Sequence, residues 1–68
     1  MNRDWVRIFT SPDFYKSELV KQVLIEHEIE AVILDKKGYP YAVGEVEVHI
    51  PRPDFQKALE IIIRNELS

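Results

Sequence analysis

The stretch Gly44-Glu45-Val46-Glu47-Val48-His49-Ile50-Pro51 decides the fold of this chain. Apolar and polar residues alternate strictly along it, which is the pattern of a β-strand with one buried face. Val46, Val48 and Ile50 therefore point to the buried side, whereas Glu47 and His49 point to the other side. We expect this strand to span Glu45–Ile50.

Two more strands and two helices are expected around this stretch. Alternation and β-branched residues predict strands at Trp5–Thr10 and Ile29–Leu34, and a 3.6-residue period predicts a helix at Pro12–His27 that Ser11 can cap. Pro51–Asp54 ends the third strand and opens the last helix. Ile61 falls outside the core stripe of that helix. The core stripes expected on the two helices are Leu19, Val20, Val23 and Leu24, and Phe55, Ala58, Leu59 and Ile62 with Ile63 on the flank.

The order strand-helix-strand-strand-helix is that of a ferredoxin-like α+β sandwich that lacks its last strand. We therefore expect one domain over residues 1–68, with a three-stranded antiparallel sheet in the order first-third-second and both helices on one face. The first strand would then be an edge. Either Arg3, Asp4 and Arg7 protect this edge, or a partner strand pairs with it.

Composition limits the possible functions. A 68-residue chain has a small core, and without cysteine it has no disulfide to support that core, so we expect a homo-oligomer. Nine basic against twelve acidic residues, net charge −3, argue against nucleic acid as a partner. The longest apolar run, Ala31–Leu34, is too short for a membrane span, and the N-terminus has no leader pattern. We expect a cytoplasmic protein without membrane contact.

The sheet face away from the helices is the first candidate binding surface. The alternation assigns to it Trp5, Arg7 and Phe9 of the first strand and Glu45, Glu47 and His49 of the third. The second strand adds either Ile29, Ala31 and Ile33 or Val32 and Leu34. Aromatic side chains on an uncovered sheet are typical contact anchors. Alternatively, Trp5 wraps around the sheet edge and Arg7 merely pairs with Glu47.

The connection Asp35–Gly44 is the second candidate surface, because it is longer than the hairpin requires. Tyr39 and Tyr41, on either side of a proline, either dock a peptide or planar ligand or fold back over the sheet. Lys36 and Lys37 precede them and add a weak attraction for an anion.

No cluster in the sequence predicts catalysis or a cofactor. His49 and Glu47 share a strand face, but a zinc site needs at least three protein ligands, so no metal is predicted. His27 is expected to interact with the end of the first helix. The chain has no cysteine nucleophile and only two glycines, too few for a phosphate-binding loop. We therefore expect a protein that is not an enzyme.

The sequence resembles a bacterial family of unknown function, described as prokaryotic signal-transducing proteins. The segments that carry the resemblance are Trp5–Thr10, Glu18–Leu24, Ile29–Val32, Gly44–Val48 and Asp54–Ile62. The resemblance implies a ferredoxin-like fold, likened to the trimeric PII regulators, and no catalytic residues. One departure is Glu28, where members of the family usually have a glycine that ends the helix.

Two hypotheses of function follow from the residues and the resemblance. The first is a non-enzymatic regulatory or protein-interaction module in signal transduction, which uses Trp5, Arg7 and Phe9 for its contact. The second is a PII-like sensor that binds an anionic metabolite or nucleotide in a cleft between subunits, with the 35–44 connection as the binding loop.

Overall fold

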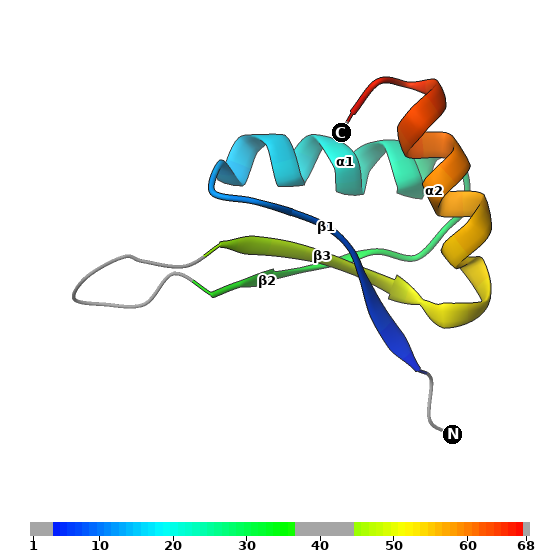
Figure 1. Ribbon diagram of the computed structural model, residues 1–68, viewed down its shortest axis with the longest axis horizontal. Helices are drawn as coiled ribbons and strands as arrows, with labels where there is room; N and C mark the ends of the chain where they lie inside the picture. Colours follow the sequence, from blue (N-terminus) through cyan, green and yellow to red (C-terminus); the bar gives the residue numbers. More distant parts are fainter. Residues whose placement is uncertain (1–3, 37–44, 68) are drawn as a thin grey trace.

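A computed structural model describes residues 4–36 and 45–67, which form an α+β fold of one sheet and two helices (Figure 1). The three strands are antiparallel and lie in the order β1-β3-β2, and both helices lie on one side of the sheet. This confirms the predicted fold class, a ferredoxin-like arrangement with three strands and two helices in the described part of the chain. The elements are β1 (Trp5–Ser11), α1 (Phe14–Glu26), β2 (Val32–Asp35), β3 (Val46–Pro51), the 3-10 turn η1 (Arg52–Asp54) and α2 (Phe55–Arg64).

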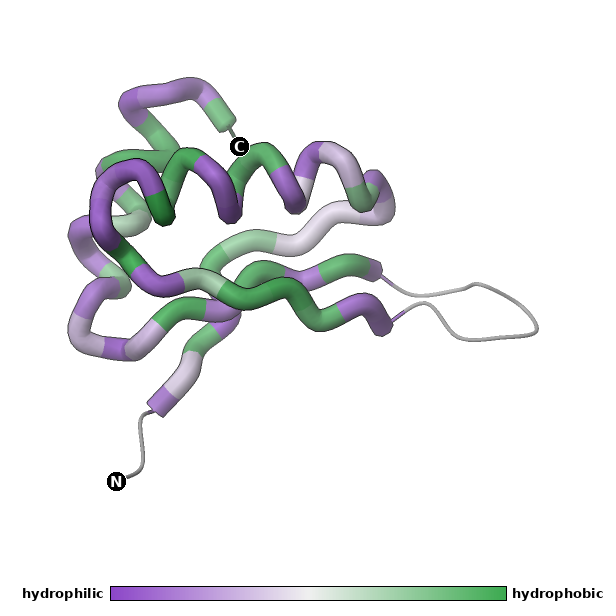
Figure 2. The backbone as a smooth tube through the Cα atoms, turned by 180° about the vertical axis from the view of Figure 1, so that it is seen from behind, coloured by the Kyte–Doolittle hydropathy of each residue, from purple (hydrophilic) through white to green (hydrophobic). Residues whose placement is uncertain are grey.

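The central strand β3 supplies the buried floor of the domain. Val46, Val48 and Ile50 are completely inaccessible to solvent, as their alternation predicts. Hydrophobic and hydrophilic residues alternate along α1 (Figure 2). Val20 and Leu24 of this helix are buried, whereas Phe14 and Ile25 stay exposed. The core cluster consists of Val20, Leu24, Ile29, Val48, Ile50, Ala58, Ile61, Ile62 and Leu67.

A β-bulge in β1 corrects the predicted placement of Phe9. The register pairs Arg7 with His49 but Phe9 with Val48, so Ile8 is an extra residue on β1. Paired residues point to the same side of a sheet, and Val48 is buried. Phe9 therefore packs against the core instead of sharing the helix-free face with Arg7. Strict alternation, which placed it on that face, fails because the bulge shifts the register by one residue.

The N-cap of α1 is Asp13, two residues after Ser11, the cap that the sequence predicts. The Asp13 side chain accepts a hydrogen bond from the Tyr15 amide at 2.9 Å, and its backbone is extended. The Ser11 hydroxyl accepts from the Asp13 amide at 3.0 Å and fixes the approach to the helix. Ser17 is fully buried and donates to the Val46 carbonyl, which ties α1 to β3.

The predicted core stripes of the helices are wrong at three residues: Leu19 and Phe55 are exposed, and Ile61 is buried. Leu19 is 53% exposed, because the buried line of α1 runs through Ser17, Val20 and Leu24 and leaves Leu19 on the far flank. On α2 the buried residues are Ala58, Ile61 and Ile62, so Ile61 belongs to the core. Phe55 is partly exposed, since the core line of α2 is rotated away from it.

No helix in the described ranges is long and apolar enough to cross a membrane.

Both helices end in the same left-handed turn. Glu28 has φ 65°, the Glu28 amide donates to the Ile25 carbonyl, and the Ile29 amide donates to the Leu24 carbonyl. Glu66 repeats this Schellman pattern after α2 with φ 57°. Ile29 belongs to this turn, where its amide is bound to Leu24 and its side chain is buried in the core. The strand β2 therefore begins at Val32 and not, as the sequence predicts, at Ile29. Glutamate adopts here the conformation for which the resembled family uses glycine.

Replacement of Glu28 by glycine tests this strained turn. A left-handed backbone costs a residue with a Cβ atom about 1–2 kcal/mol, and glycine recovers most of it. We expect Glu28→Gly to raise the free energy of unfolding by about 1 kcal/mol, or Tm by about 4–8 °C. The matched change Gln22→Gly, inside α1, should lower it by a similar amount. Urea melts measure both, and a Glu28→Gly protein no more stable than the parent would contradict the assignment.

Candidate functional site

The open face, the helix-free side of the sheet, is built from two rows of side chains across the three strands. One row joins Arg7, His49 and Val32, which are register partners, and the next joins Thr10, Glu47 and Leu34. Trp5 lies beyond the first row, opposite Pro51. The second strand therefore contributes Val32 and Leu34, one of the two sets that the sequence left open.

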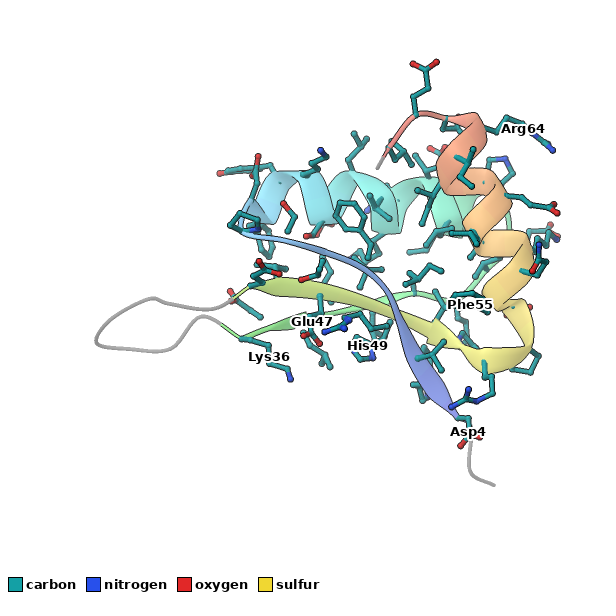
Figure 3. All side chains as sticks on the ribbon, in the orientation of Figure 1. Asp4, Lys36, Glu47, His49, Phe55 and Arg64 are labelled. Atoms are coloured by element: carbon teal, nitrogen blue, oxygen red, sulfur yellow. The ribbon has the colours of Figure 1, made fainter. Side chains whose placement is uncertain are left out.

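Glu47 holds the centre of the open face together. Its Oε1 accepts a hydrogen bond from His49 Nε2 at 2.9 Å and lies 3.8 Å from Lys36 Nζ, whereas its Oε2 accepts from Arg7 Nη1 at 3.3 Å. Figure 3 shows Lys36, Glu47 and His49 together on the side of the sheet away from the helices. One carboxylate thus bridges basic groups from β1, from β3 and from Lys36, the residue that follows β2. Beside it, Thr10 donates to Glu45 Oε1 at 2.6 Å.

The surroundings of Glu47 favour its ionised form. The hydrogen bond from His49 is the largest influence and lowers the pKa of the Glu47 carboxyl, and Arg7 and Lys36 lower it further. Partial burial acts in the opposite direction but does not outweigh them. The Glu47 side chain is only 14% exposed, because the three basic side chains and the neighbouring strands cover it. The cluster is therefore an organised patch and not a set of independent surface charges.

Apolar side chains flank this ionic centre. Trp5 is 38% exposed, Val32 42% and Leu34 41%, although all three are large and hydrophobic. The open face therefore combines accessible apolar surface with ordered charges, which is the composition of many binding surfaces.

An open depression of about 520 Å³ lies at the end of the sheet near the start of β1. Four carboxylates line it, and Arg52 is the basic residue among them, 3.4 Å from Asp4. No group of three His, Cys, Asp or Glu residues within 4–36 and 45–67 has the geometry to hold a metal ion. The acidic residues of the depression are Asp4, Glu28, Glu30 and Asp54.

The structure brings together four of the predicted site residues and places Phe9 apart from them. Trp5, Arg7, Glu47 and His49 share the open face, whereas the bulge turns Phe9 to the core side. Tyr39 and Tyr41 lie outside the described residues. Lys36 was not predicted to join Glu47, because the contact depends on which residues of β2 and β3 are in register.

No protein-family model matches the sequence, and no curated protein matches it. The resemblance to the signal-transducing family therefore stays an expectation, and the function must be argued from the open face itself.

The ionic centre predicts a pH dependence of stability. The folded pKa of Glu47 lies below that of an unfolded glutamate, about 4.3, so ionised Glu47 stabilises the fold above that pH. This contribution is lost as the pH falls through the folded pKa. We expect Glu47→Gln to be less stable than the parent at pH 7 and the difference to shrink below about pH 4.

Urea melts of both proteins between pH 7 and pH 2.5 measure this difference. Glu60→Gln, an exposed position on α2, is the control and should show no comparable loss of stability at pH 7. A Glu47→Gln deficit equal at pH 7 and pH 3 would show that the ionised carboxylate does not stabilise the fold.

Proposed function

We propose that this chain is a small non-enzymatic regulatory module that binds a protein through its open face. The observation that carries the proposal is the exposure of Trp5, Val32 and Leu34 around the ordered Glu47 cluster, on the side of the sheet that has no helix. Exposed apolar side chains that gather on one face of a protein typically mark an interaction site, whereas apolar side chains scattered singly over the surface do not. We further propose that it acts in the bacterial cytoplasm, in signal transduction.

The two sheet edges support contact through the face instead of through strand pairing. β1 pairs only with β3, and its bulge at Ile8 bends the free edge, a common device that discourages added strands. Figure 1 shows this bend in β1. The other edge strand, β2, has only four residues, which offers few backbone groups to an added strand.

Both histidines take part in interactions within the fold. The His49 ring nitrogen Nε2 is engaged by Glu47, which is itself bound to Arg7 and Lys36. His27 Nδ1 lies 2.9 Å from the Val23 carbonyl oxygen and donates to it, as expected for a residue at a helix end. Each of these ring nitrogens has a structural partner. Both interactions contribute to the fold.

A sensor of anionic ligands finds less support. The depression near β1 is lined by four carboxylates, which would repel a nucleotide or a phosphorylated metabolite. Most of the 35–44 connection, the proposed binding loop, lies outside the described residues. The charges around this depression therefore argue against an anion site there, and the protein-binding module is the proposal that the described residues support.

Site-specific photo-crosslinking tests the proposed function. We expect a benzoylphenylalanine at position 34, on the open face, to give a discrete protein adduct when the protein is irradiated in its host cells. The same group at position 15, which is 82% exposed on α1, is the matched control and should give none. Mass spectrometry identifies the adduct. No adduct at position 34, or equal adducts at both positions, would contradict the proposal.

A further inference from the structure

We infer that the partner of the open face is a second copy of this chain, packed face to face around a two-fold axis perpendicular to the strands. This inference rests on the proposed function, since it names the protein that the open face binds. The axis passes between the row of Arg7, His49 and Val32 and the row of Thr10, Glu47 and Leu34, and exchanges the two rows.

The exchange of rows makes the open face complementary to itself. His49 faces Glu47 of the second copy, so that an imidazole meets a carboxylate twice in the dimer. Val32 faces Leu34 of the second copy, and two exposed apolar side chains, 42% and 41% exposed in one chain, cover each other. Arg7 faces Thr10 of the second copy, where the guanidinium meets a hydroxyl. All three kinds of contact are favourable.

The rival arrangement, with the two-fold axis along β3, is not complementary. It places His49 against His49 and Glu47 against Glu47 of the second copy, and two carboxylates that face each other repel. It also sets Val32 against Arg7 of the second copy, because these residues flank His49 on opposite strands. Charge and apolar complementarity therefore select the axis perpendicular to the strands.

The geometry of sheet packing is compatible with this dimer. Two sheets pack about 10 Å apart with their strands within about 30° of each other. Arg7 and Lys36 are mostly exposed and have long aliphatic stems, so they can lie along the interface and keep their charges at its rim.

The small area of the open face limits the affinity that the dimer can reach. Three strands about 4.8 Å apart cover roughly 15 Å by 20 Å. This area is small compared with the roughly 800 Å² that each partner buries in an ordinary stable complex. We therefore expect a dimer that dissociates on dilution, with a Kd on the order of micromolar or weaker.

Two single variants and their mixture test the exchange of rows. Val32→Glu sets a carboxylate against Leu34 of the second copy, and Leu34→Lys sets an ammonium against Val32. We expect each variant alone to weaken self-association by about tenfold or more, since each leaves two charges against apolar partners. In an equimolar mixture, V32E faces L34K across the axis, so mixed dimers should form with an affinity near that of the parent.

Sedimentation velocity over a concentration series measures these equilibria. Tyr15→Glu, on the opposite side of the molecule, is the matched control and should sediment like the parent. Circular dichroism melts verify that the variants fold, and both substitutions lie at surface positions. A parent protein that stays monomeric at millimolar concentration would overturn the inference. Single variants that lose the dimer without recovery in the mixture would overturn the proposed axis.

The crosslinking experiment separates failure of this inference from failure of the proposed function. A monomeric parent together with an adduct from position 34 to a different protein leaves the interaction module standing and removes the second copy. A monomeric parent without any adduct removes both. An adduct of twice the chain mass, with recovery in the mixture, supports both.

Discussion

The pairing of β3 with a strand on each side is the constraint on which the rest of this structure depends. Because β3 is central, one set of its side chains is completely buried beneath the helices, and the other set is fixed on the open face. Val48 anchors the core, and its neighbours along the strand, Glu47 and His49, organise the polar side. The core and the candidate binding surface are therefore two sides of the same strand.

The open face gets its composition from the register of the neighbouring strands. β2 brings Val32 and Leu34 beside His49 and Glu47, and β1 brings Arg7 and Thr10 to their other side. The bulge at Ile8 decides which residues of β1 take part, because it turns two successive apolar residues, Ile8 and Phe9, to the core side. Without the bulge, Phe9 would lie on the open face beside the ionic centre around Glu47. A domain with a small core thus gains one more apolar residue for it.

The fold and part of the face follow from sequence patterns, and the rest depends on tertiary contacts. Alternation in β3 and the proline at Pro51 are local features, and they predict the strand and its buried side correctly. The order of strands and helices along the chain, compared with a ferredoxin-like sandwich, predicts the strand order and the central place of β3. The bulge has no local marker, since Ile8 and Phe9 are equally apolar and either can face the core. The sequence pattern predicts the wrong side of α2 for Ile61, because three isoleucines follow one another and only packing decides which of them are buried. The Lys36 contact with Glu47 likewise needs the register between β2 and β3.

The register of β1 against β3 is the central claim, and nuclear Overhauser contacts of the Phe9 ring test it most directly. The structure predicts contacts between this ring and the Val48 methyl groups on the core side, and none with the His49 ring. Contacts between the Phe9 and His49 rings, without contacts to Val48, would show that β1 continues without a bulge. The open face would then have a different composition, and the binding surface proposed for it would not exist in this form.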